Sequence, residues 1–384
     1  MNILIIPSWF PSKGDPINGS FFLEQAIALA NSNHNVTVLN VTYMGRKDYF
    51  RLSNLKTTRC IINGVQVISK TFPGFGIGRK KKPKYTVFRN VLHYLFKKYS
   101  LSKKIDVIHC HSYLPAGFFG VKLGQMYDIP VVVTEHASNL INKEDIKNKY
   151  MLDYTLKNAT KIIAVGESLK NSLEELSNYS RKVQVVPNLV SSDFEYETPP
   201  ELEPFTFASV GSLIPRKNYE TLLLAFSLFN NKVTNSQLRI IGDGPEYDSL
   251  VQLSKKLKID KSVFFLGQKS RKETSKLMKK SNAFILLSKS ETFGVVYAEA
   301  ISCGRPVISK RNGGAEYIIN ENNGLVIDSE DPRDYANAMI EMSENYQSFN
   351  FREMSIQSHE KYSSDNISKK LTNIYKEVVQ SHEK

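Results

Sequence analysis

Short apolar runs rich in valine and isoleucine alternate along the chain with helix-length amphipathic segments. This pattern is typical of buried parallel strands joined by crossover helices. In the first half it predicts strands at Asn2–Ile6, Val36–Val41, Val65–Ser69, Asp106–Cys110, Pro130–Thr134, Lys161–Val165 and Val183–Val186. In the second half it predicts strands at Thr206–Val210, Gln237–Ile241, Val263–Leu266, Ala283–Leu287, Pro306–Ser309 and Gly324–Ile327. The fold class is therefore α/β.

A proline-rich stretch separates the two sets of strands. Residues 188–204 contain Pro199, Pro200 and Pro204 among scattered acidic residues, and we expect them to form a linker. The chain then divides into a Rossmann-like domain at 1–187 and a second at 205–365, with a helix at about 366–384 packing back on the first. Doubly wound sheets bind ligands at the carboxyl ends of their strands. A cleft between two such domains is therefore the expected active site.

Composition narrows the class of protein. The 384 residues are 41% hydrophobic and 23% charged, as in ordinary globular domains. The cysteines, Cys60, Cys110 and Cys303, are odd in number and lack a C-x-x-C spacing, which argues against a disulfide scaffold or a zinc site. No signal peptide is recognisable, and no apolar run approaches the ~20 residues that span a bilayer. We expect a soluble protein of the reducing cytoplasm.

The net charge of +13 comes from one stretch of the chain. Between Tyr49 and Ile105 there are fourteen basic residues and no acidic one, whereas the rest of the chain is close to neutral. A basic stretch of this size is compatible with a nucleic acid or an anionic membrane as partner. No recognised nucleic-acid-binding motif accompanies it, so we expect no nucleic-acid partner.

Two segments of the second domain carry groups suited to a phosphorylated sugar. Gly211 opens a turn that leads to the adjacent cations Arg216 and Lys217 at a helix start, which is a good anion site. An ordinary loop with solvated cations explains this segment equally well. Further on, Glu291 and Glu299 are eight residues apart, and a helix that begins between them would offer free N–H groups to a diphosphate. A capping acid and a surface glutamate are the alternative interpretation.

Together these segments resemble the retaining GT-B glycosyltransferases of family 4, also called glycosyl transferases group 1. The family signature is a Glu-x7-Glu motif, here Glu291 to Glu299. It is preceded by a G-x-L-x-x-x-K segment, here Gly211 to Lys217, and followed by a glycine-rich segment, here Gly313-Gly314-Ala315-Glu316-Tyr317. The resemblance covers nearly the whole chain and implies a GT-B architecture, with two doubly wound Rossmann-like domains facing across a cleft.

The resemblance assigns donor-binding roles to the second domain. Arg216 and Lys217 would hold the nucleotide diphosphate, and both would act in catalysis by stabilising its charge. Many members have an arginine where this chain has Ser212, so the positive charge falls on these two residues. The remaining implied contacts are Glu299 for the ribose, Gly267 near the base, and Glu291, Phe293 and Gly294 for the donor sugar, Glu291 being also catalytic.

In the first domain, His136 ends a predicted strand and resembles the histidine of the family's Thr-x-His segment, which lies under the donor sugar near its anomeric carbon. We assign His136 that catalytic role. In the family the loop that contains Gly19 flanks the donor phosphate and the acceptor, so the resemblance makes Gly19 a candidate contact to the donor. Glycine at such a corner allows close approach of a ligand. Trp9 and His111 are expected on the acceptor side. Core packing explains Trp9 equally well, and a metal site at His111 is disfavoured because no third ligand is apparent.

The resemblance implies transfer of a hexose or N-acetylhexosamine from a UDP- or GDP-sugar to a glycan or lipid-linked glycan, with retention at the anomeric carbon, in bacterial surface polysaccharide synthesis. The family needs no cofactor and no metal ion, and this chain has no Asp-x-Asp triplet. One alternative is a nucleotide-sugar epimerase or hydrolase of the same fold, against which the Glu-x7-Glu motif argues. The other, from a different class, is a basic nucleic-acid-binding protein. A dinucleotide dehydrogenase is disfavoured, because Gly74-x-Gly76-x-Gly78 lacks the G-x-G-x-x-G spacing.

The basic stretch fits an acceptor that is carried by a lipid. Each cation near an anionic leaflet contributes ~1 kcal/mol, so a few suffice for reversible attachment. We therefore expect a cytoplasmic enzyme that is peripheral on the inner face of the cell membrane. The residues expected to dock there are Arg79, Lys80, Lys81, Lys82, Lys84, Arg89, Lys97 and Lys98.

Overall fold

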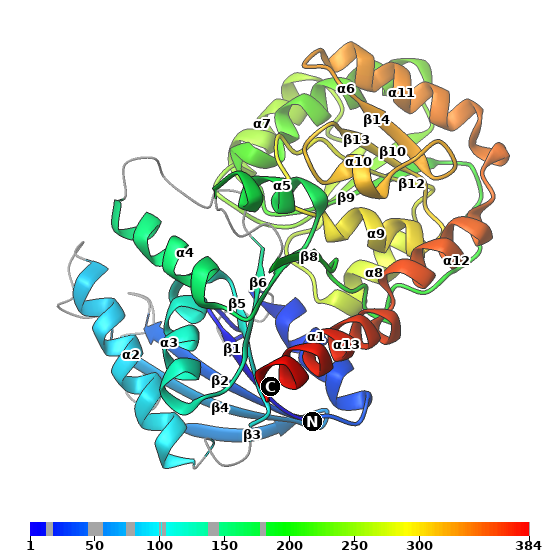
Figure 1. Cartoon of the computed structure of the whole chain (residues 1–384). Helices are drawn as coiled ribbons and strands as arrows, with labels where there is room; N and C mark the ends of the chain where they lie inside the picture. Colours follow the sequence, from blue (N-terminus) through cyan, green and yellow to red (C-terminus); the bar gives the residue numbers. More distant parts are fainter. Residues whose placement is uncertain are drawn as a thin grey trace. The chain divides into compact units, whose positions relative to one another are not determined.

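The computed structural model describes residues 1–12, 18–44, 57–73, 81–99, 101, 105–136, 146–176 and 182–383. The chain forms two compact units (Figure 1). The first comprises Met1–Leu189 together with Ser364–Lys384, and the second comprises Val190–Ser363. The first segment of the first unit thus ends at residue 189, where the sequence predicted 187. The second unit ends at residue 363, where the sequence predicted 365, and it begins at 190 and not at 205.

The first unit is built on a sheet of eight strands in the order β3-β4-β2-β1-β5-β6-β7-β8. All neighbouring strands are parallel except β3 and β4. The order reverses between β1 and β5, which is the point where doubly wound sheets bind ligands. The strands are β1 Asn2–Pro7, β2 Asn35–Met44, β3 Thr58–Ile62, β4 Val65–Pro73, β5 Val107–His111, β6 Val131–Glu135, β7 Lys161–Ala164 and β8 Val183–Val185.

Strand β3 was not predicted, because its exposed residues lack the apolar alternation of a half-buried strand. It is joined to β4 by Asn63 and Gly64, both with positive φ. An Asn-Gly pair between two strands is the strongest short signal of a β-hairpin. The hairpin explains why the first sheet is mixed rather than purely parallel.

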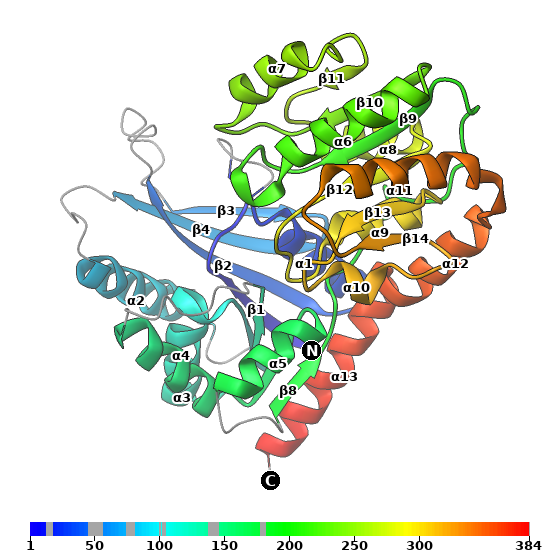
Figure 2. The ribbon, with the colours of Figure 1, turned by 90° about the horizontal axis from the view of Figure 1, so that it is seen from above.

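Helices cover both faces of the first sheet (Figures 1 and 2). On one face, α1 (Ser20–Asn31) packs beside α13 (Ser364–His382), whose residues Ile367, Leu371, Ile374, Tyr375 and Val378 enter the core at helical spacing. On the other face lie α2 (Lys81–Lys98), α3 (Phe118–Tyr127) and α4 (Ile146–Asn158); α5 (Glu167–Leu176) follows β7. The last helix of the chain therefore completes the core of the first unit.

The second unit has a six-stranded parallel sheet in the order β11-β10-β9-β12-β13-β14, with the reversal between β9 and β12. The strands are β9 Phe205–Val210, β10 Ser236–Ile241, β11 Val263–Phe265, β12 Ala283–Leu286, β13 Val307–Lys310 and β14 Gly324–Ile327. The helices are α6 Tyr219–Lys232, α7 Tyr247–Lys256, α8 Arg271–Lys279, α9 Val295–Ser302, α10 Ala315–Ile318, α11 Pro332–Glu344 and α12 Phe351–Tyr362. Both units are thus doubly wound α/β units, as the sequence predicts.

Most of the predicted linker is packed onto the second unit, to which residues from Val190 onward belong. Phe194 is fully buried, and the buried guanidinium of Arg305 donates hydrogen bonds to the carbonyls of Glu197 (2.9 Å) and Thr198 (3.5 Å). Proline-rich backbone has carbonyls that no sheet or helix satisfies, and Arg305 supplies donors for them. The stretch is therefore a bound strap and not a free linker.

In the part of the chain that the structure describes, no helix combines the length and apolar content needed to cross a lipid bilayer.

Candidate active site

In the second unit, the predicted donor residues meet at the carboxyl edge of the sheet where the strand order reverses. Arg216 and Lys217 follow β9, and Glu291 follows the adjacent strand β12. Lys217 Nζ lies 2.5 Å from Glu291 Oε1, and Arg216 Nη1 lies 3.6 Å from Glu291 Oε2. The side chains of Lys217 and Glu291 are only 13% and 11% exposed, whereas that of Arg216 is 48% exposed. Two cations therefore converge on one carboxylate at this edge.

Backbone hydrogen bonds hold these two loops together. The N–H of Lys289 donates to the carbonyl of Arg216 (2.8 Å), and the Arg216 guanidinium donates to the carbonyl of Ser290 (2.7 Å). The N–H of Glu291 donates to the carbonyl of Asn312, which belongs to the loop after β13. Three loops at the ends of neighbouring strands are thus fixed relative to one another, which limits how far the charged groups can move.

Helix α9 begins directly after Gly294, between Glu291 and Glu299 as the sequence predicts. Gly294 is its N-cap with φ 81, and a Cβ there would lie 2.5 Å from the ring of Tyr297, so only glycine fits. Phe293 is buried and packs against the ring of Tyr362 at 5.5 Å. Phe293 can therefore offer backbone to a ligand, while its ring belongs to the core. Glu291 stays on the loop before the helix.

Glu299 lies in α9 with its side chain only 1% exposed. Its carboxylate is paired with Arg271 at 2.6 Å, and the Arg271 guanidinium lies 4.9 Å from the ring centroid of Phe194. Arg271 was not predicted from the sequence. It is the first residue of α8, between Ser270 and Glu273 of the capping box, and that box was the available signal that a helix begins here. Gly267, with φ 68, has open space where a Cβ would point.

In the first unit, three histidines gather at the carboxyl ends of β5 and β6. His109 is bonded at both ring nitrogens, to the Thr134 hydroxyl (2.7 Å) and to the Tyr375 hydroxyl of α13 (2.6 Å). His111 Nδ1 lies 3.1 Å from His136 Nε2. His109 is thus a satisfied core histidine, whereas His111 and His136 share one hydrogen bond.

Aromatic rings of α1 and the loop before it enclose this pair. The ring of Phe22 is stacked on His111 at 4.4 Å and meets His136 edge-on at 4.9 Å. The ring of Trp9 packs on Phe22 at 5.2 Å, which supports core packing as the role of Trp9. Gly19, with φ 77, would place a Cβ 3.0 Å from both Trp9 Cδ1 and the Trp9 carbonyl oxygen. The structure thus supplies a packing reason for glycine at this position.

Burial keeps these imidazoles neutral. Desolvation lowers the pKa of His109 and of His136 to about 3, and it lowers the pKa of His111 well below its usual value, with further lowering from the neighbouring histidines. The structure also assigns a role to Glu135, which the sequence did not single out. Its buried carboxylate accepts the N–H of Tyr113 and of His136, each at 2.7 Å, and so fixes the backbone beside His136.

The predicted membrane-docking residues fall partly outside the described residues. This is the case for Arg79 and Lys80, while Lys81, Lys82 and Lys84 are placed only by their backbone in the first turn of α2. Arg89, Lys97 and Lys98 are exposed. The opposite side of α2 is buried through Phe88, Leu92, Leu95 and Phe96. Helix α2 therefore packs on the sheet with a basic outer face.

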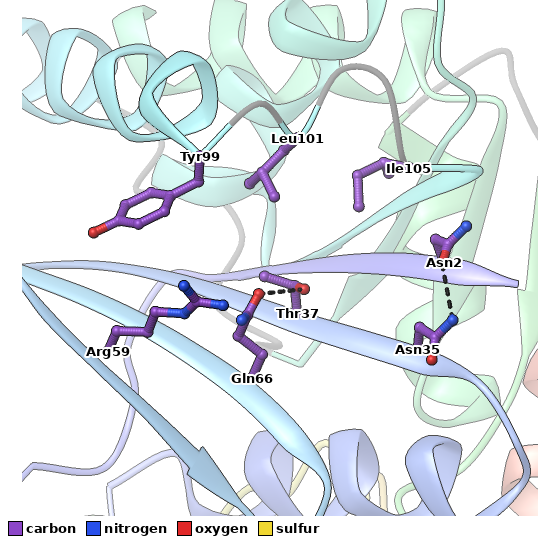
Figure 3. Close-up of a pocket in the computed structure, with 8 residues that line it drawn as sticks. All are labelled: Asn2, Asn35, Thr37, Arg59, Gln66, Tyr99, Leu101 and Ile105. Atoms are coloured by element: carbon purple, nitrogen blue, oxygen red, sulfur yellow. Dashed lines mark hydrogen bonds between the residues drawn. The ribbon is translucent and has the colours of Figure 1, made fainter.

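A pocket of about 280 Å³ lies at the opposite, amino-terminal edge of the first sheet (Figure 3). Asn2, Thr37, Arg59 and Gln66 are among the polar residues that line it, and Tyr99, Leu101 and Ile105 form the other wall. It contains no residue that was predicted to bind donor or acceptor. Within the described ranges, no group of three or more His, Cys, Asp or Glu residues is arranged to hold a metal ion.

Comparison with known proteins agrees with this geometry. The family model for "Glycosyl transferases group 1" matches residues 193–361, and the family model for "Glycosyltransferase Family 4" matches residues 19–194. A glycosyltransferase of Methanocaldococcus jannaschii is 32% identical over 272 residues, 68% of this chain and 74% of that protein. The chain is therefore a glycosyltransferase. It belongs to the group 1 glycosyltransferases with the two-domain, Rossmann-like GT-B fold.

Two further similarities are informative. The Escherichia coli UDP-Gal:alpha-D-GlcNAc-diphosphoundecaprenol alpha-1,3-galactosyltransferase is 27% identical over 276 residues, 66% of this chain and 69% of that protein. The crystal structure of Anabaena HepE in complex with UDP and glucose matches with a TM-score of 0.73 at 18% identity, covering 98% of this chain and 100% of that one. At this identity the second similarity establishes the fold alone.

Proposed function

We propose that this protein is a retaining glycosyltransferase that moves a hexose or N-acetylhexosamine from a nucleotide diphosphate sugar to a glycan or lipid-linked glycan in bacterial surface polysaccharide synthesis. The observation that carries the proposal is the convergence of Arg216 and Lys217 on Glu291 beside the start of α9. Cations next to a helix N-terminus suit a diphosphate, and a carboxylate that accepts hydrogen bonds suits sugar hydroxyls.

The transition state of such a transfer places growing negative charge on the leaving diphosphate. Lys217 and Arg216 stabilise that charge, and the N–H groups at the first turn of α9 add to it. Glu291 then exchanges its contacts to the cations for hydroxyls of the donor sugar. Glu299 accepts hydrogen bonds from the ribose, and His136 contacts the donor sugar near its anomeric carbon. No metal ion is required, because the two cations supply the positive charge.

Two of the similar proteins support the proposed donor and acceptor. The Anabaena structure contains UDP and glucose, which favours a UDP-sugar donor here. The name of the Escherichia coli enzyme specifies UDP-Gal and an acceptor linked to diphosphoundecaprenol, which favours a lipid-linked acceptor. If the acceptor is carried by a membrane, the exposed cations of α2 can bind the anionic lipids of that membrane. The proposal therefore includes peripheral attachment to the anionic inner face of the cell membrane.

The decisive experiment is a donor screen. Purified protein is incubated with a panel of UDP- and GDP-sugars and a mixture of glycan and lipid-linked acceptors, and nucleotide release and product anomers are measured with and without EDTA. The proposal expects acceptor-dependent release, an α-product from an α-donor, and no effect of EDTA. Donor consumption without any acceptor would instead identify an epimerase or hydrolase, and loss of activity in EDTA would exclude the metal-free mechanism.

Membrane attachment is tested separately by co-sedimentation with liposomes. Binding to vesicles with anionic lipid that weakens in salt is expected, with a Lys97→Glu/Lys98→Glu variant reduced. Equal binding to neutral and anionic vesicles would contradict attachment through the basic face. A salt-sensitive complex with generic RNA that sugar nucleotides do not displace would favour the nucleic-acid alternative.

A further inference from the structure

The two histidines that share a hydrogen bond occupy the ends of neighbouring strands. His111 is the last residue of β5 and pairs in register with Thr134 of β6. His136 lies two residues beyond Thr134, directly after β6, and its Nε2 lies 3.1 Å from Nδ1 of His111. Parallel pairing thus delivers both rings to the edge of the sheet where ligands bind.

The position of His111 is fixed from several sides. Its ring is fully buried, stacked on Phe22 at 4.4 Å with 27° between the planes, and the ring of His109 lies 4.5 Å away. His109 uses both of its nitrogens for Thr134 and Tyr375. His111 therefore directs its Nδ1 at His136, on backbone that the hydrogen bond from Ser8 N–H to the His111 carbonyl (3.2 Å) also holds.

One nitrogen of each ring remains without a partner among the described residues, namely Nε2 of His111 and Nδ1 of His136. Burial keeps both rings neutral, so each ring carries one N–H. If His111 donates from Nδ1, His136 accepts at Nε2 and carries its own hydrogen on Nδ1. In the reverse arrangement, His111 carries a hydrogen on its buried Nε2.

These two arrangements differ in cost. A buried N–H without an acceptor is more rarely tolerated than an unused acceptor. Both unpartnered nitrogens are themselves covered, but His111 is fully buried as a residue, whereas His136 follows the end of its strand and is partly exposed. The favoured arrangement is therefore the one in which His111 Nδ1–H donates to His136 Nε2 and the free N–H lies on His136.

We propose that His111 is a positioning residue, which acts through His136 and not on the acceptor. It holds the His136 ring in one orientation and one tautomer, so that Nδ1–H points to an oxygen of the donor. This inference rests on the proposed function, because it presupposes that His136 faces the donor sugar. It replaces the acceptor-side role that the sequence suggested for His111.

Two variants of His111 separate the hydrogen bond from the packing. His111→Phe keeps an aromatic ring stacked on Phe22 but removes Nδ1. His111→Asn loses the stack but places an amide close to the position of Nδ1. His93→Phe serves as the matched control, since His93 also has one ring hydrogen bond, to Tyr127 at 2.9 Å, but lies on α2. All three are checked for folding by the fluorescence of Trp9.

The first readout is the ¹⁵N spectrum of histidine-labelled protein without donor, with the His136 signals assigned from a His136→Gln sample. The wild type should show a protonated Nδ1 and an unprotonated Nε2 for His136, and His111→Phe should show the two tautomers mixed. A wild-type His136 protonated on Nε2, or an unchanged spectrum in His111→Phe, would overturn the proposal. This readout needs no turnover, so it does not depend on the donor screen.

The second readout is the steady-state rate with the best donor. Loss of one neutral hydrogen bond is worth ~1 kcal/mol, so His111→Phe should lower kcat by roughly fivefold with little change in the donor KM. His111→Asn should recover most of kcat, and His93→Phe should match the wild type. If His111→Asn is as poor as His111→Phe, or if only the acceptor KM changes, the positioning role is refuted. If the wild type transfers no sugar at all, the proposed function fails instead.

Discussion

Lys217 Nζ and Glu291 Oε1 lie 2.5 Å apart in the second unit, and both side chains are largely buried. The Glu291 carboxylate thus pairs with the lysine that the proposed mechanism assigns to the donor diphosphate. In the proposed mechanism, a donor phosphate replaces the Glu291 carboxylate beside Lys217. The pairing with Glu291 avoids the cost of a buried ammonium without a counter-charge. Arg216 is more exposed and shares the same carboxylate at 3.6 Å.

The first prediction concerns this exchange. Lys217→Ala should lower kcat by roughly a hundred- to a thousand-fold, because one preorganised donor to the leaving group is lost. Arg216→Ala should lose less, since its guanidinium is half exposed and also bonded to the Ser290 carbonyl. Lys232→Ala, at the end of α6, is the control. A loss below tenfold for Lys217→Ala, measured as nucleotide release, would remove it from the catalytic role.

The second prediction concerns the buried pair of Arg271 and Glu299 at 2.6 Å. Arg271→Met keeps the length of the side chain over Phe194 but takes the counter-charge away, and breaking a buried pair costs about 3 kcal/mol. The double variant Arg271→Met/Glu299→Gln should regain part of that loss. The check is a double-mutant cycle by urea unfolding. Additive losses would show that the pair does not couple.

The third prediction is a stability profile in pH. His109 and His136 have a pKa of about 3 in the native state because they are buried, whereas the unfolded chain binds protons near pH 6.5. Below pH 6.5 the histidines of the unfolded chain therefore bind protons, whereas the native rings stay neutral. The free energy of unfolding thus decreases as the pH is lowered. The free energy of unfolding should be level above about pH 7 and drop by about 2 kcal/mol per imidazole on going to pH 5. Trp9, the single tryptophan, reports the transition; a level profile down to pH 5 would contradict the neutral cluster.

The fourth prediction concerns Gly19 at the start of α1. Gly19→Ala combines a left-handed φ of 77 with a Cβ at 3.0 Å from Trp9, so it should destabilise the first unit by about 1–2 kcal/mol. Trp9 fluorescence should shift in the native state as well, because the indole has to move. Gly64→Ala, with φ 83 but its nearest contact at 3.7 Å, isolates the backbone effect. Equal losses for both would mean that the contact with Trp9 costs nothing.

Much of the fold follows from the sequence because buried parallel strands are continuous apolar runs. Every strand of the second sheet begins and ends within one residue of its predicted range, and α9 begins between Glu291 and Glu299 as predicted. The edge strand β3 escaped because its exposed residues carry no burial pattern, although Asn63-Gly64 marked the turn. Local hydrophobic patterns predict which segments are buried, but they do not identify exposed strands at the edge of a sheet.

The candidate site was predicted only as far as motifs reach. Arg216, Lys217 and Glu291 stand in motifs with fixed spacing, and the structure brings them together. Three further residues have partners that are distant in the sequence, so no local spacing points to them. They are Arg271 with Glu299, Glu135 with Tyr113, and Tyr375 with His109. The same holds for Arg305, which donates to the carbonyls of Glu197 and Thr198 in the stretch that composition alone described as a linker.

The helix α13 has a consequence for how the protein is made. The second unit is one continuous segment, Val190–Ser363, whereas the first needs Ser364–Lys384 to cover its core and to bond His109 through Tyr375. During synthesis the ribosome delivers the second unit complete while the first still lacks a helix. The half that is translated first is thus the last to be finished, and a pause before residue 364 would leave its apolar face open to chaperones.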